Sequence, residues 1–499
     1  MKQYNILKSA VSIAILLTFF ANTMQAQTIR YVKPNGIGDG SSWANAAGNI
    51  QSMIDASTTG HQVWISGGTY LLPSTLEMKE GVNIYGGFFG NETSINARPK
   101  SDLDENGIIE AWEFTNATVL DGQGTFQVLR QNTDFTVETI FDGVTITKGN
   151  HQEGNGAYIK VNGKLINSIV RHNTGNAVQG GGIYNFGGTV THCLVSENSG
   201  GDNAPRGGGI FNRYTGTVEG IVSDSRVENN LAGTAGTTHS GGIHGGIVIR
   251  CIIKGNHAIH GGGLHASTAY NCLIINNTAG AGNAGSGGGS EGGKYYNCTF
   301  VNNSAVFTGG GIANAVATNC IFWQNNAQHG TQIGTSGSAT YSAIQGGFTG
   351  TGNITLEADN ENGGPMFIDP TAGNYQLQAT SPCIDKGDNT AVQNPETATD
   401  LAGNPRIYGG TVDMGCYEWG SGVGIKEPVQ SLSDLIIFPN PTNGMVYITA
   451  NEAIPEITLY STDGRMLKQV HSTEIDMSQY AVGIYFLRVS GKTVKVVKQ

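Results

Sequence analysis

The chain has 499 residues, and its 27 Lys and Arg residues against 38 Asp and Glu residues give a formal net charge of −11. This acidic balance makes nucleic acid an unsuitable partner, because phosphate binding depends on clustered basic residues. The 75 glycines follow no triplet period, which excludes a collagen-like triple helix and indicates many tight turns.

Residues 1–26 have the features of a secretory signal peptide. Lys2 and Lys8 precede the apolar run 10–20, and Ala26 provides a small residue before the expected cleavage point. The run is short for a transmembrane helix, and no later stretch is apolar enough to span a bilayer. We therefore expect an exported chain without a transmembrane segment in its mature form.

The next part of the chain predicts short strands separated by glycine turns, together with one helix. Ile50, Met53 and Ile54 fall at helical spacing and give the helix one apolar face, which we expect to cover the open end of a solenoid. The strands are predicted at 28–32, 63–65, 69–72, 82–85, 119–122, 126–129 and 140–146.

A repeated phrase organises residues 180–325. A glycine-rich motif, usually Gly-Gly-Gly followed by Ile or Leu, begins at Gly180, Gly207, Gly241, Gly261, Gly287 and Gly309. The period of roughly 21 to 33 residues is typical of a solenoid in which each repeat is one coil.

The second half of the phrase fixes the register of the coils. Five cysteines share one register with Ser168 and Ser225, and these seven positions are Ser168, Cys193, Ser225, Cys251, Cys272, Cys298 and Cys320. Each is followed five residues later by an asparagine, at Asn173, Asn198, Asn230, Asn256, Asn277, Asn303 and Asn325. Equivalent residues of stacked coils lie about 4.8 Å apart, so we expect a ladder of asparagine amides and a column of buried thiols that pack without disulfides.

These patterns predict an all-β fold, a right-handed parallel β-helix over residues 27–419 followed by a small β-sandwich. Residues 379–419 break the repeat and contain Cys383 and Cys416, which lie outside the thiol column and are the best disulfide candidates. Residues 420–433 read as a linker. Residues 434–499 contain further short strands and an Asp463-Gly464 hairpin turn.

The last 65 or so residues resemble a type IX secretion C-terminal sorting domain. The resemblance is carried by Phe438-Pro439-Asn440-Pro441, Asp463-Gly464-Arg465 and Gly483-Ile484-Tyr485-Phe486-Leu487. It implies export to the surface of a Gram-negative bacterium or release from it, with the secretion machinery as the partner of this domain.

The central coils resemble right-handed β-helices of the pectate-lyase-like superfamily, and also the repeats of chlamydial polymorphic outer membrane proteins. The second resemblance is carried by Gly309-Gly310-Gly311-Ile312 and by the Phe-x-x-Asn phrases at 300–303 and 322–325; other coils have Val or Ile in place of Phe. The segment around Cys383 and Cys416 is similar to the end-cap module of such bacterial β-helices, in which Ala is expected at both positions. The paired replacement by Cys supports the disulfide interpretation.

Residues 102–113 match the twelve-residue calcium loop. Oxygen ligands at positions one, three and five, glycine at six and a carboxylate at twelve suit Ca²⁺, and the implied ligands are Asp102, Asp104, Asn106, the Ile108 carbonyl and Glu113. Pro99 leaves no room for the usual entering helix, so the expected role is structural. The alternative is a solvated acidic turn.

One stripe of side chains is expected to point outward, because neighbouring residues of a strand face opposite sides. It comprises Tyr158, Tyr184, Phe211, His244 and His265, followed by Glu291 and Ala313. Such a stripe predicts either stacking on the sugar rings of a glycan or a stack of side chains beneath a covering loop.

Catalysis has little support in the sequence. The chain contains no Asp-Asp pair, and candidate bases concentrate only at His244, His257, His260, His265 and Arg250. We therefore expect a non-catalytic surface protein that binds polysaccharide or host glycan, or acts as an adhesin. The alternatives are a polysaccharide lyase or glycoside hydrolase on the same scaffold, and a purely structural spacer.

Overall fold

The computed structural model describes residues 28–421 and 436–499, apart from short gaps at 176, 202–205, 214, 217, 234–236, 282–283, 358, 360–362, 393–397, 439, 441, 450–456, 462–464, 471 and 490–491. The predicted signal peptide, almost all of the predicted linker and the Asp463-Gly464 turn lie outside these residues. The chain divides after Ser421 into two compact units.

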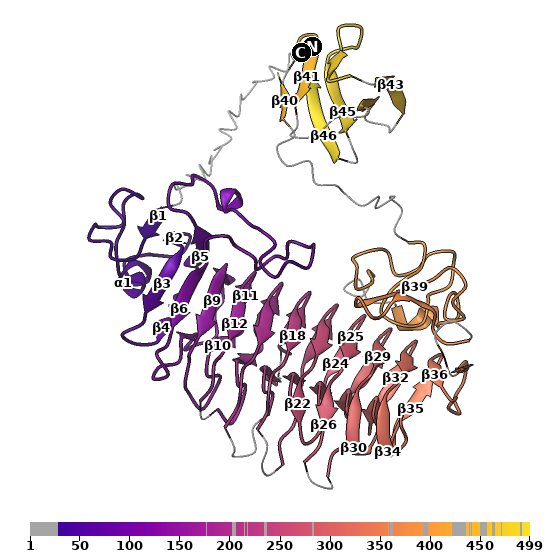
Figure 1. Cartoon of the computed structure of the whole chain (residues 1–499). Helices are drawn as coiled ribbons and strands as arrows, with labels where there is room; N and C mark the ends of the chain where they lie inside the picture. The colour runs from indigo at the N-terminus through magenta and orange to yellow at the C-terminus, as the bar shows by residue number, and fades with distance from the viewer. Residues whose placement is uncertain are drawn as a thin grey trace, which may run out of the picture. The chain divides into compact units, whose positions relative to one another are not determined.

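The first unit is a parallel β-helix, as predicted (Figure 1). Most coils contribute one strand to each of three parallel sheets, so successive coils supply the backbone partners that one short strand lacks. The first sheet consists, in spatial order, of β1 (Ile29–Val32), β2 (Gln62–Ser66), β5 (Asn83–Phe88), β8 (Thr139–Asp142), β11 (Gly163–Ile166), β14 (Thr189–Thr191), β17 (Ile221–Ser223), β20 (Ile247–Ile249), β24 (Thr268–Tyr270), β28 (Lys294–Tyr296), β32 (Val316–Thr318) and β35 (Ser338–Thr340).

In the regular coils, each strand of the second sheet begins at the residue that follows the glycines of the motif. It consists of β4 (Leu76–Glu77), β7 (Leu129–Arg130), β10 (Ala157–Lys160), β13 (Ile183–Phe186), β16 (Ile210–Arg213), β19 (Ile243–His244), β23 (Leu264–His265), β27 (Ser290–Glu291) and β31 (Ile312–Ala313). This sheet therefore displays the predicted stripe.

The third sheet carries the residues between the cysteines and the asparagines. Its strands are β3 (Gly68–Leu71), β6 (Thr118–Asp121), β9 (Val144–Thr147), β12 (Ile169–Arg171), β15 (Leu194–Ser196), β18 (Arg226–Glu228), β21 (Ile252–Lys254), β25 (Leu273–Ile275), β29 (Thr299–Val301), β33 (Ile321–Trp323), β36 (Ala343–Gln345) and β37 (Ile354–Leu356). A short fourth sheet joins β22 (His257–Ala258), β26 (Thr278–Ala279), β30 (Ser304–Thr308) and β34 (Asn326–His329).

The core is one continuous column of inward apolar residues. Val170, Val195, Val227, Ile253 and Ile274 pair in register from coil to coil and are fully buried. Helix α1 (Ile50–Asp55) begins at the cap residue Asn49 and contacts β1 and β2 at the first coil, as predicted from its apolar face. A single 3₁₀ turn, η1 (Ile95–Ala97), follows the early coils.

The predicted asparagine ladder is present. Each asparagine donates its Nδ2 hydrogen to Oδ1 of the asparagine in the next coil, over 2.9 to 3.0 Å from Asn173 to Asn325. The five repeat cysteines are fully buried and free, as expected for packing residues. Burial raises the pKa of the Cys193 thiol to about 12.

The three glycines of one motif meet three different demands. Gly261 has a φ of +63°, in the left-handed region that glycine adopts without strain. A Cβ on Gly262 would lie 2.4 Å from the Thr278 carbonyl oxygen, and a Cβ on Gly263 would lie 3.0 Å from the Asn277 amide. The motif thus combines a turn, a close approach of two backbone segments and room for the ladder.

The segment between β37 and Ser421 packs against the side of the β-helix. Its antiparallel pair β38 (Phe367–Asp369) and β39 (Asn374–Leu377) and the short helix η2 (Asn389–Val392) belong to it. Phe367 and Cys416 share an apolar cluster with outward residues of the third sheet, among them Leu273, Val301 and Trp323. Figure 1 shows this segment beside β25, β29 and β36. It therefore covers the outer face of the third sheet, where the resemblance implied a cap for the end of the solenoid.

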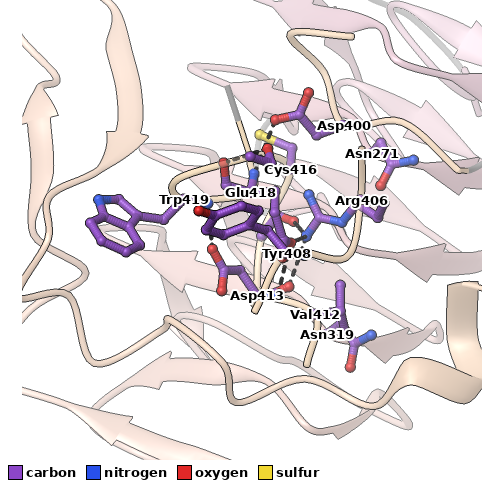
Figure 2. Close-up of polar contacts among 12 residues, drawn as sticks. Asn271, Asn319, Asp400, Arg406, Tyr408, Val412, Asp413, Cys416, Glu418 and Trp419 are labelled. Atoms are coloured by element: carbon purple, nitrogen blue, oxygen red, sulfur yellow. Dashed lines mark hydrogen bonds and ion pairs between the residues drawn. The ribbon is translucent and has the colours of Figure 1, made fainter. Parts of the chain in front are cut away.

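A buried polar network holds this covering segment together (Figure 2). Arg406, whose side chain is fully buried, donates from Nη2 to the carbonyls of Asp413 and Gly415 at 2.7 and 2.6 Å. The Glu418 carboxylate lies 3.9 Å from Nη2 and accepts from the backbone N–H groups of Tyr408 and Asp413. Burial nevertheless raises the pKa of Glu418 to about 7.

The second unit is a small β-sandwich, as predicted. One antiparallel sheet contains β40 (Ile436–Phe438), β41 (Met445–Thr449) and β44 (Glu474–Asp476); the other contains β43 (Met466–Val470), β42 (Ile457–Tyr460), β45 (Gly483–Val489) and β46 (Lys492–Lys498). Residues of both sheets, including Val446 and Leu487, share one buried core. Among the described residues of the whole chain, no helix is long and apolar enough to cross a membrane.

Candidate functional site

The predicted stripe forms one stacked column on the second sheet. Tyr158 pairs in register with Tyr184, Phe211 with His244, and His244 with His265. Ring centroids of successive members lie 4.7 to 5.2 Å apart. The predicted register is therefore correct.

Of the two expected arrangements, the stack of side chains describes the middle of the column. Tyr184 and Phe211 are only 3% and 5% exposed, because each ring is sandwiched between the rings of the neighbouring coils and Phe186 lies 6.0 Å from Tyr184. The middle of the column therefore stabilises the coils by ring stacking. Only its two ends remain partly accessible.

The first end of the column is an aromatic–cation patch, which we define as Arg130, Tyr158, Lys160, Phe186 and Arg213. The guanidinium of Arg130 lies 4.6 Å from the Tyr158 ring centroid, and that of Arg213 lies 5.4 Å from the Phe186 ring centroid. Register places Tyr158 beside Arg130, and Phe186 between Lys160 and Arg213. Tyr158 and Phe186 are half-buried, and Arg213 is exposed.

Polar neighbours fix the side chains of this patch. Arg130 pairs with Glu153 at 3.4 Å, Lys160 pairs with Asp134 at 3.5 Å, and Arg213 Nη1 donates to the Tyr184 hydroxyl at 3.3 Å. Burial raises the pKa of Tyr158 to about 12, so its hydroxyl stays a hydrogen-bond donor. Cations held beside partly accessible rings can bind sugars that carry acidic groups.

The other end of the column is a cluster of imidazoles beside one carboxylate. The ring centroids of His239 and His265 lie 4.6 Å apart, and His260 Nδ1 lies 3.2 Å from Glu291 Oε2. Arg250, which the sequence grouped with these histidines, instead pairs with Asp224 at 2.7 Å, and His257 bonds to Thr278 at 2.8 Å. His239 was missed, although it occupies the position immediately before the glycine motif, as Arg206 and His260 do.

The predicted calcium loop brings three of its carboxylates together. Ligand oxygens of Asp102, Asp104 and Glu113 lie within 4.8 Å of one another. Asp102 Oδ2 accepts from the Gly107 N–H at 2.7 Å, and Asn106 Oδ1 accepts from the Ile108 N–H at 2.8 Å. The chain thus turns sharply around Gly107 with its oxygens on the inside of the turn.

Two features of the loop bear on cation binding. Burial alone would raise the pKa of Glu113, but the N–H groups of Glu110 and Leu103, each 2.9 Å from a carboxylate oxygen, lower it overall and favour the charged form. Arg226 of β18 lies 3.3 Å from Asp104 and 2.9 Å from Glu110. The protein therefore already places one positive charge at the edge of the loop.

The disulfide predicted between Cys383 and Cys416 is absent from the structure, where both thiols are free. Both are fully buried in the apolar cluster that joins the covering segment to the third sheet. Burial raises the pKa of each thiol to about 12, which leaves little of the reactive thiolate. These cysteines act as small apolar packing residues.

Comparison with known proteins identifies the C-terminal domain. Residues 436–499 match the family described as the secretion system C-terminal sorting domain. A crystal structure of pectate lyase Pel9A is similar to the chain, with a TM-score of 0.48 and 15% sequence identity, over 78% of this chain and 96% of that one. No curated protein matches the chain by sequence.

The chain is therefore a parallel β-helix protein with a type IX sorting domain. The sorting domain directs it out of the cell, to the cell surface or into the medium, and implies contact with the type IX secretion machinery.

Proposed function

We propose that the protein is a non-catalytic glycan-binding protein of the cell surface that takes acidic polysaccharides on the second sheet. The observation that carries the proposal is the aromatic–cation patch, where two half-buried rings lie beneath guanidinium groups and Lys160 completes the positive charge. Elsewhere the chain is acidic, with a net charge of −11. An anionic chain would therefore favour this patch over the rest of the surface.

The positions of the other segments also favour the second sheet as the glycan-binding face. The covering segment packs on the later strands of the third sheet, and the loop around Asp104 reaches Arg226 on an earlier strand of that sheet. Arg213 on the second sheet is exposed. A long polymer would thus find its aromatic contacts on the second sheet.

Replacing Lys160 and Arg213 together by glutamine is expected to weaken binding to acidic polysaccharides by about tenfold or more, because each charged hydrogen bond contributes about 1.5 to 3 kcal/mol and about 1.4 kcal/mol is tenfold. Retention on glycan arrays and affinity electrophoresis measure this. Lys254→Gln, at an exposed lysine of the third sheet, is the matched control and should bind normally.

Incubating the native protein and the double variant with polysaccharides also distinguishes glycan binding from the alternative functions. Unchanged retention of the double variant would contradict this site, and no retention of the native protein on any glycan would favour a structural spacer. Unsaturated sugars detected by ultraviolet absorption, or new reducing ends, would reveal a lyase or a hydrolase and overturn the non-catalytic assignment.

We also propose that loop 102–113 binds one structural Ca²⁺ through Asp102, Asp104, Asn106, the Ile108 carbonyl and Glu113. The proposal is supported by the three convergent carboxylates and by the hydrogen bonds that favour a charged Glu113. Hard oxygen ligands of this kind suit Ca²⁺ and discriminate against transition metals.

Calcium is expected to raise the melting temperature of the native protein and to release or absorb heat in a calorimetric titration. Glu113→Gln removes one of the converging carboxylates and should weaken binding at least tenfold. Glu105→Gln, in the same loop but outside the proposed ligand set, should bind as the native protein does. The absence of both calcium heat and calcium-dependent stabilisation would refute this site.

A further inference from the structure

The imidazole end of the column contains more nitrogen and oxygen atoms than its hydrogen bonds use. Among the described residues, the buried Nδ1 atoms of His239, His244 and His265 have no hydrogen-bond partner, and Oε2 of Glu291 makes no hydrogen bond but lies 3.2 Å from His260 Nδ1. Leaving buried polar atoms unpaired destabilises a folded protein. Such a concentration at one place indicates that something absent from the protein chain satisfies them.

The geometry points to a binding site for a divalent transition-metal ion formed by His239, His265 and Glu291. One ligand atom from each residue lies within 4.8 Å of the other two. Ligands about 2.0 to 2.2 Å from an ion such as Zn²⁺ are themselves about 3 to 4 Å apart, so small side-chain rotations would complete the site. Two imidazoles and one carboxylate suit Zn²⁺ and its neighbours in the transition series rather than Ca²⁺.

Three successive coils supply the three ligands. His239 bridges to His260 in the next coil, and His265 pairs in register with Glu291 in the coil after that. A bound ion would therefore add a link between coils that are already joined by backbone hydrogen bonds, the asparagine ladder and stacked rings. His265 and Glu291 belong to the column on the second sheet. His239 belongs to a second column, formed by the residues immediately before the glycine motif.

The surroundings prepare the ligands for a metal. Asn314 donates to Glu291 Oε1 at 3.2 Å and holds the carboxylate with Oε2 toward His260. Secondary contacts of this kind orient ligands in metal sites.

An entry path lies beside the cluster. A cavity of about 240 Å³ is lined by His260, Ala284, Gly285, Ser286 and Phe307. His260 borders both the cavity and Glu291, so an ion or its remaining water ligands can be reached from this side. The exposed Arg206 is the nearby cation that opposes binding.

The test is a Zn²⁺ titration of the chelator-treated full-length protein by calorimetry, with excess Ca²⁺ present to fill any calcium site. We expect one equivalent of Zn²⁺, and a Co²⁺ derivative with visible d–d absorption that reports nitrogen and oxygen ligation. Glu291→Gln and His239→Gln should each weaken Zn²⁺ binding at least tenfold. His192→Gln, an exposed histidine away from the cluster, should change nothing.

Absence of saturable Zn²⁺ binding, or unchanged affinity in either ligand variant, would overturn the assignment. His239 forms an isolated bridge outside the named strands, so its variant tests the site even if Glu291→Gln perturbs folding. Tryptophan fluorescence of the chelator-treated variants verifies folding before titration. Glycan retention is scored separately, because this site does not depend on the aromatic–cation patch.

Discussion

Asn277→Ala is expected to lower the free energy of unfolding of the β-helix by about 4 kcal/mol, because at least two buried groups lose partners at about 1 to 3 kcal/mol each. Asn277 is fully buried. Its Oδ1 accepts from the N–H and from Nδ2 of Asn256 at 2.9 and 3.0 Å. Its Nδ2 donates to Asn303 Oδ1 and to the Ile253 carbonyl, both at 2.9 Å.

Urea unfolding followed by tryptophan fluorescence measures this loss. All five tryptophans lie before residue 420, so the signal reports the β-helix without the sorting domain. The matched control is Asn326→Ala, at the exposed residue directly after the last ladder asparagine, and it should cost less than about 0.5 kcal/mol. Equal losses in the two variants would contradict a stabilising ladder.

Gly262→Ala is expected to cost about 3 kcal/mol or more, because inserting atoms into a filled interior displaces its surroundings. The added Cβ would lie 2.4 Å from the Thr278 carbonyl oxygen and 2.5 Å from the Gly288 carbonyl oxygen. Both obstacles are backbone atoms of stacked segments, which cannot rotate away as a side chain can. The same urea experiment measures the effect.

Gly124→Ala separates this collision from backbone strain. Gly124 has a φ of +69° and open space where a Cβ would lie, so alanine there carries only the left-handed penalty of about 1 kcal/mol. A loss at Gly262 no larger than that at Gly124 would show that the coils can separate to accommodate a methyl group.

The fold could be predicted because the coils repeat their chemistry in register. Each cysteine or serine of the column precedes its asparagine by five residues, as Cys251 precedes Asn256, and parallel stacking converts equal spacings into vertical columns. The exposure of the stripe could not be predicted in the same way. Tyr184 is buried by rings of other coils, a property of packing between repeats that no single repeat contains.

The sequence contains a signal for the covering segment, namely the mostly apolar outward residues of the later strands of the third sheet. The regular repeat drew attention away from this signal. In β12 the outward residue Arg171 is charged, whereas β25, β29 and β33 are buried along their whole length. Strands that are apolar on both faces require cover on both faces. His239 left a weaker signal, because Ser240 replaces the first glycine of its motif and obscures the alignment of His239 with Arg206 and His260.

The stacked thiols impose a condition on the life of this protein outside the cell. All seven cysteines are free and buried while the coils are intact, although exported proteins meet oxidising surroundings in which exposed thiols form disulfides. Loss of the coils would expose every thiol at once, and random cross-links would then prevent the strands from restacking in register. We therefore expect unfolding outside the cell to be irreversible, so that the lifetime of the protein depends on how slowly its coils open rather than on an equilibrium.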